Sequence, residues 1–209
     1  MRTLLTGIFF LAFILPTYAA DDFDIAEGIE YEVLSQPQAV ENQGKVQVIE
    51  FFSYACPHCY NLEPHVLTWL KNKPDNVEFI QIPAIFNAQW EAFASIYYTA
   101  EVLGAADKLH PLIFDAIHGP GKKISGLDDL KAIFTANGIS GDDFDNTLKS
   151  FAVANKVRKA KAMTKDYEIK SVPMVVVQGK YRTNSTLAHS HKNVFKVVDH
   201  IINNTVSKK

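Results

Sequence analysis

The sequence predicts an α/β fold from three short apolar segments and the helix between the first two. Residues 46–52 (VQVIEFF) and 76–83 (NVEFIQIP) have the length and composition of strands, and the first is apolar enough to be buried on both faces. Residues 57–70 carry apolar side chains on one side of a predicted helix. Strand character returns at 172–177 (VPMVVV). This order is typical of an α/β domain.

Shorter signals predict the remaining strands and the closing helix. Residues 31–34 form a weaker candidate strand ahead of the first clear one. The segment 178–180 (QGK) predicts a tight turn into a strand over 181–183, so that the two neighbouring runs form a hairpin. Residues 191–206 predict an amphipathic helix. Its apolar stripe consists of Val194, Val197, Val198 and Ile201.

From 89 to 167 the sequence changes to helical spacing, which predicts a helical block of roughly 75 residues. Three helices are followed by a fourth, long one, which is predicted to begin at Ser140 because Ser140 and Asp143 have the spacing of a capping box. The apolar positions of the four helices are Trp90, Phe93 and Tyr97; Leu109, Leu112, Ile113 and Ala116; Leu127, Leu130, Ile133 and Phe134; and Phe144, Leu148 and Phe151.

The first residues have the features of a secretory signal peptide. One basic residue, Arg2, precedes an apolar run over 4–15, and small residues follow at a position suited to cleavage after Ala19 or Ala20. The run is shorter than the roughly 20 residues that span a bilayer, and a proline ends it, which argues against an uncleaved membrane anchor. We therefore predict a signal peptide over 1–19 and a soluble mature protein.

The charge of the mature chain argues against nucleic-acid binding. Cleavage would remove one of the 21 basic residues and none of the 23 acidic ones, which leaves a net charge near −3. A nucleic-acid-binding protein would instead present a basic surface. Export would place the chain in an oxidising space, where paired cysteines can stay joined.

Both cysteines of the chain lie in the stretch 52–60 (FSYACPHCY), with two residues between them. A disulfide that closes so short a loop removes little entropy from the unfolded chain, so it would stabilise the fold poorly. The spacing therefore indicates that Cys56 and Cys59 are present for their chemistry, as a redox-active disulfide with no other cofactor.

Cys-x-x-Cys also occurs in zinc sites and in haem attachment motifs. Haem attachment requires histidine directly after the second cysteine, where this chain has Tyr60. Structural zinc needs four ligands. The histidines near the motif, His58 and His65, and the pair His189 and His191 lack the familiar ligand spacing. A redox pair is the better interpretation, and we expect no metal.

The position of the pair predicts an acidic thiol. If the helix begins at the motif, Cys56 is the N-cap and Pro57 the first helical residue, where its missing N–H costs nothing. The backbone N–H groups of His58 and Cys59 then point at the Cys56 sulfur and stabilise its thiolate. A pKa three to five units below about 8.5 would favour the reduced form by roughly 4 to 7 kcal/mol. The disulfide would then be strongly oxidising, with Cys56 the exposed nucleophile and Cys59 the buried resolving thiol.

Two further residues stand out near the motif. A partly charged His58 between the thiols would stabilise the thiolate further, although it could equally be an ordinary exposed side chain. Glu50 is an acid in an apolar strand, so it is costly unless protonated or paired. It could relay a proton to Cys59, or it could pair with Lys71 or Lys73 for stability alone.

The Val172-Pro173 dipeptide is a candidate cis peptide bond ahead of a strand. A cis bond would expose the backbone of Val172 for pairing with an extended substrate. An ordinary trans proline at the start of a strand is the commoner arrangement, and the residues alone leave both open.

Together these features resemble the periplasmic thiol:disulfide oxidoreductases of the DsbA family. The resemblance rests on 50–60 (EFFSYACPHCY), Val172-Pro173, the turn at 179–181 and the helical block between them, and it covers the mature chain in order. It implies a thioredoxin fold with an inserted helical domain and a groove beside the motif for unfolded peptide. The implied site residues are Cys56 (nucleophile), Cys59 (resolving thiol), Pro57 and His58 (the dipeptide that tunes the potential), Glu50 (buried acid), Pro173 (cis proline) and Val172 (substrate binding).

The resemblance also implies boundaries, partners and a location. The thioredoxin-like domain would comprise 20–86 and 168–209, and the helical insertion 87–167. Unfolded exported proteins would be the substrates, in the periplasm of a Gram-negative bacterium. A quinone-coupled inner-membrane partner of the DsbB type would reoxidise the protein.

Other functions stay open from the sequence. A reductase or isomerase would usually carry a dimerisation module, and we identify none, so a monomer is expected. A third interpretation is a thioredoxin-like metal carrier that uses the two cysteines as soft ligands. Pro64, inside the first predicted helix, should bend it and alter the active-site turn.

Overall fold

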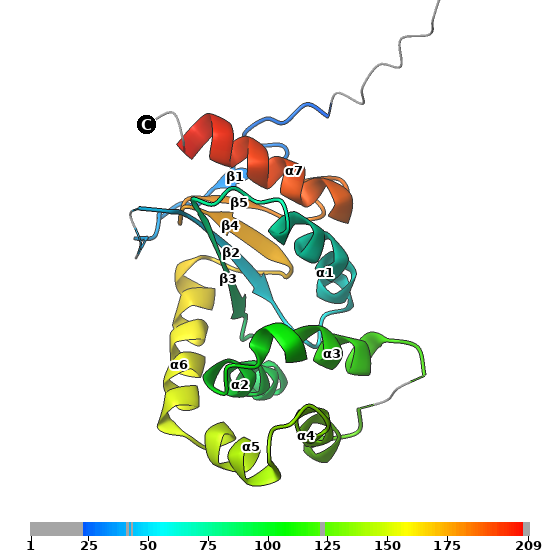
Figure 1. Ribbon diagram of the computed structural model, residues 1–209. Helices are drawn as coiled ribbons and strands as arrows, with labels where there is room; N and C mark the ends of the chain where they lie inside the picture. The colour runs from blue at the N-terminus through cyan, green and yellow to red at the C-terminus, as the bar shows by residue number, and fades with distance from the viewer. Residues whose placement is uncertain (1–22, 41, 43, 122–123, 207–209) are drawn as a thin grey trace, which may run out of the picture.

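The computed structural model describes residues 23–40, 42, 44–121 and 124–206 (Figure 1). The predicted signal peptide therefore lies outside the described residues. Within them, five strands form one mixed sheet with the order β1-β5-β4-β2-β3. The strands are β1 (Glu32–Val33), β2 (Val46–Phe52), β3 (Val77–Pro83), β4 (Met174–Val177) and β5 (Tyr181–Thr183); the helices are α1 (Pro57–Leu70), α2 (Ala88–Val102), α3 (Ala106–His118), α4 (Leu127–Ala136), α5 (Gly141–Leu148), α6 (Phe151–Asp166) and α7 (His191–Ile201).

The interior strand β2 contributes to both layers of the core. It pairs in parallel with β3 and antiparallel with β4, and all seven of its residues are buried. Val48 packs in one apolar cluster with residues of α1 and α7, whereas its neighbour Ile49 packs in a second cluster with residues of α2, α3 and α6. This alternation is the reason for the continuous apolar run in the sequence. The predicted α/β class, a thioredoxin fold with inserted helices, is confirmed.

The inserted helices lie between β3 and β4 in the chain. Figure 1 shows α2, α3, α4 and α5 gathered at one end of the sheet, while α1 and α7 lie together on one side of it. None of the helices in the part of the chain that the structure describes is long and apolar enough to span a bilayer.

The predicted long helix from Ser140 is wrong, because it is two helices. Ser140 caps α5 as expected by accepting a hydrogen bond from the backbone N–H of Asp143. However, α5 ends at Leu148, and Ser150 caps a new helix by accepting from the N–H of Val153. Phe151, expected on an apolar face, is 75% exposed. The second serine cap interrupts a pattern that periodicity alone would continue.

The remaining boundaries differ slightly from those predicted. The first strand of the hairpin, β4, begins at Met174 and not at Val172, because Pro173 has no N–H to donate to a ladder. The tight turn is confirmed, with positive φ at Gln178 and Gly179. The closing α-helix ends at Ile201 and continues as a π-helix to Val206. The first helix runs through Pro64 as one element.

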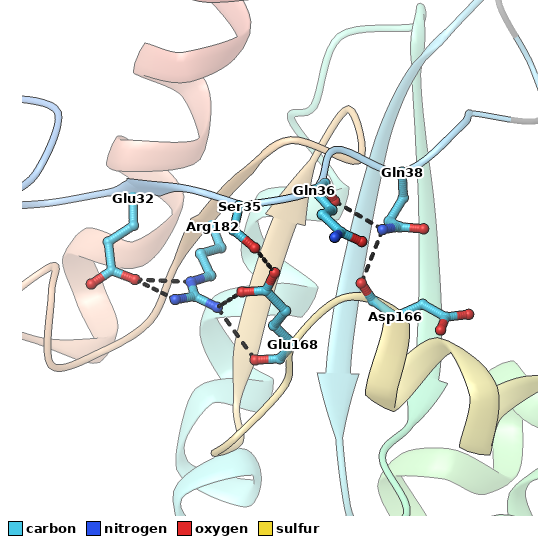
Figure 2. Close-up of polar contacts among 7 residues, drawn as sticks. All are labelled: Glu32, Ser35, Gln36, Gln38, Asp166, Glu168 and Arg182. Carbon is cyan, nitrogen blue, oxygen red and sulfur yellow. Dashed lines mark hydrogen bonds and ion pairs between the residues drawn. The ribbon is translucent and has the colours of Figure 1, made fainter.

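A cluster of polar side chains connects the chain segment that follows α6 to the sheet (Figure 2). Arg182 on β5 donates to the Glu32 carboxylate at 2.8 Å and to the backbone carbonyl of Glu168 at 3.3 Å. Glu168, just after α6, has a φ of 54° and accepts a hydrogen bond from the Ser35 hydroxyl. Arg182 therefore connects strand β1 to the chain segment that leads from α6 back to β4.

Arg182→Leu is expected to lower the free energy of unfolding by about 1–2 kcal/mol, because it removes a partly buried ion pair and leaves the Glu168 carbonyl without that donor. Urea denaturation measures the change. The matched control is Arg158→Leu on the exposed face of α6, where we expect a change within about 0.5 kcal/mol. Equal losses in the two variants would contradict the structural role of Arg182.

Candidate active site

The two cysteines lie where strand β2 passes into the first helix, α1. Cys56 is the N-cap of α1, with φ of −101° and ψ of 111°, and Pro57 is at the first helical position, as predicted. Cys59 is in the first turn and is 1% exposed. The predicted exposure of Cys56 is wrong in degree, because the residue is only 8% exposed. It is nonetheless the more exposed of the two cysteines.

The surroundings of Cys56 favour its thiolate. A hydrogen bond from the Cys59 side chain has the largest effect, and the backbone N–H groups of Cys59 and His58 and the charge of His58 act in the same direction. Against the opposing effect of burial, they lower the pKa of Cys56 from 9.0 to about 6. The shift has the predicted direction and is at the small end of the predicted range.

The surroundings of Cys59 do the opposite. Burial is the largest cause of a pKa raised well above 9.0, and the hydrogen bond to Cys56 and the negative charges of Cys56 and Glu50 add to it. The pair therefore consists of one acidic thiol and one thiol that retains its proton. This difference between the partners is what a nucleophile and a resolving thiol require.

The loop before β4 approaches Cys56 from the other side. The Val172–Pro173 bond is cis, as the resemblance implies, and the Cys56 Sγ lies 3.5 Å from the carbonyl oxygen of Val172. The structure thus brings together residues that are more than a hundred positions apart in sequence. His58 is exposed and stacks on His191 of α7, with ring centroids 6.2 Å apart.

Glu50 is buried beneath the motif, 1% exposed. Burial, then the nearby Glu63 carboxylate, raises its pKa to about 8, although a hydrogen bond from Gln81 at 3.0 Å acts against the rise. The proposed lysine partner is wrong, since among the described residues no ion pair joins Glu50 to Lys71 or Lys73. The Lys73 ammonium donates instead to the carbonyl of Val77 on the edge strand.

Sequence reasoning missed the polar side chains that surround Glu50. His110 of α3 lies within 3.0 Å of Gln81, 3.5 Å of the Glu63 carboxylate and 2.9 Å of the Tyr54 hydroxyl. One signal could have revealed His110: it is three residues from Ile113, inside an apolar helical stripe, and is therefore an anomaly of the same kind as Glu50. In the described part of the chain, no cluster of three or more metal-ligating side chains is present.

A dithiol pair at the N-terminus of a helix that follows an interior strand of the sheet, with a cis proline beside it, defines a thioredoxin-fold disulfide protein. The family model for the DSBA-like thioredoxin domain matches residues 76–201. The thiol:disulfide interchange protein DsbA of Pseudomonas syringae is 36% identical over 178 residues, which cover 85% of this chain and 83% of the relative. That of Azotobacter vinelandii is 37% identical over 179 residues, with 86% and 84% covered. The chain belongs to the DsbA family and is a disulfide oxidoreductase.

Solved structures agree with this assignment. The crystal structure of Pseudomonas aeruginosa DsbA matches with a TM-score of 0.81 at 33% identity, covering 90% of this chain and 99% of that one. DsbA from Xylella fastidiosa matches with a TM-score of 0.80 at 26% identity, covering 88% and 99%. The similarity extends over the sheet and the inserted helices together.

Proposed function

We propose that this protein donates the Cys56–Cys59 disulfide to newly exported proteins, through a mixed disulfide at Cys56. The observation that carries the proposal is the contrast between the two thiols. A Cys56 thiolate stabilised at a helix N-terminus makes the reduced form favourable and makes Cys56 a good leaving group. Membership of the DsbA family supports the same direction of reaction.

The reaction balances over two exchange steps. A client thiolate attacks the Cys56 sulfur, and the bond to Cys59 breaks. A second client thiolate then attacks the client sulfur of the mixed disulfide, and Cys56 leaves as a thiolate. The client loses two electrons and two protons, of which one ends on Cys59 and the other is released.

We assign Glu50 as the buried acid that relays one of these protons to Cys59 as it leaves. With a pKa of about 8, Glu50 is largely protonated at neutral pH, and its charge influences Cys59. The Val172 carbonyl oxygen lies 3.5 Å from the reacting sulfur and Pro173 follows it in the chain, so we assign both residues to substrate binding. His58 adds a favourable charge next to Cys56.

The setting follows from the sequence and from the family. We propose that the signal peptide over 1–19 directs the chain to the periplasm of a Gram-negative bacterium. There, unfolded exported proteins are its substrates, and a DsbB-type quinone-linked membrane protein reoxidises it. We propose that it acts as a monomer with no cofactor other than the disulfide.

The test is oxidation of a dithiol peptide by one equivalent of the oxidised mature protein. We expect rapid and nearly complete transfer of the disulfide, and none from Cys56→Ser. Cys59→Ser, which cannot resolve the intermediate, should form a stable mixed disulfide at Cys56 with a peptide preactivated as a mixed disulfide. An equilibrium that leaves the peptide reduced would favour a reductase and overturn the proposal.

The same preparation separates an oxidase from an isomerase. An isomerase should restore native pairing in a scrambled protein faster than an oxidase does. We expect this protein to form disulfides quickly in a reduced client but to correct scrambled ones slowly.

A further inference from the structure

A residue next to the motif, Tyr54, is held along its whole length by one helix of the insertion. Tyr54 lies two positions before Cys56 and is 1% exposed. Its hydroxyl group lies 2.9 Å from the Nδ1 of His110, and its ring packs edge-on against that of Phe114, with centroids 4.9 Å apart. Its backbone carbonyl oxygen lies 2.8 Å from the Nε2 of His118. The three contacting residues follow one another at intervals of four on α3, so they form one stripe of that helix.

The bond from His118 fixes the chain that leads into the active-site turn. A carbonyl oxygen only accepts hydrogen bonds, so the His118 Nε2 carries a proton and donates it to the carbonyl oxygen of Tyr54. The N–H of the same peptide unit, that of Ala55, donates to the Ser53 hydroxyl at 3.2 Å. Both polar groups of this peptide unit are therefore bonded, one within the turn and the other from α3.

His118 also contacts the residue that follows the cysteine pair. Its ring stacks on that of Tyr60, with centroids 5.5 Å apart and the planes 29° from parallel. The Tyr60 hydroxyl forms a hydrogen bond with Asp115, which lies one turn before His118 on α3. Helix α3 therefore touches the chain on both sides of the two thiols, and Figure 1 shows it next to the start of α1.

We propose that His118 is a positioning residue for the redox pair: through its bond to the Tyr54 carbonyl it holds the active-site turn, so that the helical insertion contributes to how strongly the disulfide oxidises. The Cys59 side chain and the backbone N–H groups of Cys59 and His58 stabilise the Cys56 thiolate. Hydrogen bonds of this kind weaken steeply when their direction deviates.

The effect should differ between the two redox states. The oxidised protein has no charge on the Cys56 sulfur, so a less well fixed turn costs the reduced protein more than the oxidised one. Loss of the His118 bond should therefore make the disulfide less oxidising. This inference deepens the proposed function and rests on it in one respect, because an oxidising disulfide is what a donor requires.

The test is the pH dependence of the ultraviolet absorbance of the thiolate in the reduced mature protein, compared between wild type and His118→Leu. We expect the pKa of Cys56 to rise in this variant by about half a unit to one unit, which is about three- to tenfold in the ionisation constant. At pH 8 the equilibrium with glutathione should shift about as much toward the disulfide. His118→Gln, whose amide can place a donor near the position of Nε2, should keep most of the wild-type pKa.

The matched control is His65→Leu, which removes an imidazole from a later turn of α1 and should leave the pKa of Cys56 unchanged. Urea denaturation shows whether each variant is folded. If His118→Leu does not fold, His118→Ser takes its place, because serine is polar but too short to reach the Tyr54 carbonyl.

Three results would overturn the proposal: an unchanged pKa of Cys56 without the His118 donor, an equal rise in His118→Gln, or an equal rise in His65→Leu. A purely structural role of His118 would lower the free energy of unfolding and leave this pKa unchanged. The readout needs no client protein. If the protein failed to oxidise a dithiol peptide, the proposed function would fall, while a raised pKa in His118→Leu would still establish the positioning role.

Discussion

Reduced wild-type protein is expected to lose about 4 kcal/mol of stability, relative to Cys56→Ser, as the pH is lowered from 9 to below 6. The cause is the Cys56 thiolate, whose pKa falls from 9.0 to about 6 on folding. A group whose pKa is depressed in the folded state contributes its stability fully above the unfolded value. That contribution disappears as the pH falls through the folded value.

Urea denaturation of both proteins under reducing conditions, at several pH values, measures the difference. The matched control is Cys59→Ser, which keeps a hydrogen-bond donor next to Cys56, so it should retain most of the pH dependence. A difference between wild type and Cys56→Ser that stays constant with pH would show that the thiolate is not stabilised. DsbA is the standard example of a low thiolate pKa and an oxidising disulfide, so the direction is the one its family establishes.

The same stabilisation explains why the disulfide should be oxidising. The oxidised protein has no thiolate, so it lacks this contribution. Because the thiolate stabilises only the reduced folded protein, it makes reduction of the disulfide more favourable by the same free energy. The hydrogen bond from Cys59 is the largest contributor, ahead of the helix N-terminus. The resolving thiol therefore helps to set the potential before it takes part in the exchange.

Local features of the site could be predicted from the sequence because local chemistry determines them. Pro57 at the first helical position fixes Cys56 as the N-cap, and the two spacer residues fix Cys59 in the first turn. The acid in an apolar strand identified Glu50 as a buried group. These predictions needed only neighbouring residues and the preferences of a helix start.

The partners of Glu50 could not be predicted, because tertiary packing selects them. Lysines near in sequence were the natural candidates, yet the side chain that bonds to Glu50, Gln81, comes from the edge strand β3, and the nearby carboxylate, Glu63, comes from α1. Gln81 is adjacent because β2 and β3 pair in parallel with Glu50 opposite Gln81. A register of this kind, and the seating of α3 against it, are not encoded in any one segment.

The break between α5 and α6 has a different reason. The apolar spacing is compatible with one long helix. Whether the helix continues or ends depends on Ser150, which can either be an interior helical residue or cap a new helix. Capping at Ser150 stabilises a new helix start and lets α6 run back toward the sheet. Periodicity measures which face is apolar and carries no information about such a change of direction.

Glu50→Gln is expected to raise the free energy of unfolding by about 3 kcal/mol at pH 7, and by about 5 kcal/mol above pH 8, with no gain near pH 4. The pKa of Glu50 is raised from 4.5 to about 8 by folding. A carboxyl group with a raised folded pKa loses stability as the pH rises from the unfolded value through the folded one. Glutamine keeps the shape and can still bond to Gln81 without the buried charge.

The background for this measurement should be Cys56→Ser, because the two groups have opposite pH dependence. Between pH 6 and pH 8 the reduced wild-type protein gains stability from the Cys56 thiolate and loses it from ionisation of Glu50, with equal slopes. The free energy of unfolding of the wild-type protein should therefore change little between pH 6 and pH 8. In Cys56→Ser it should fall as the pH rises, and in Glu50→Gln it should rise.

The control Glu78→Gln, on the neighbouring strand, should stay within about 0.5 kcal/mol of its parent. If Glu50→Gln destabilises the protein at pH 8, the carboxylate has a partner that compensates its charge, and Glu50 is then a structural ion and not a proton donor to Cys59.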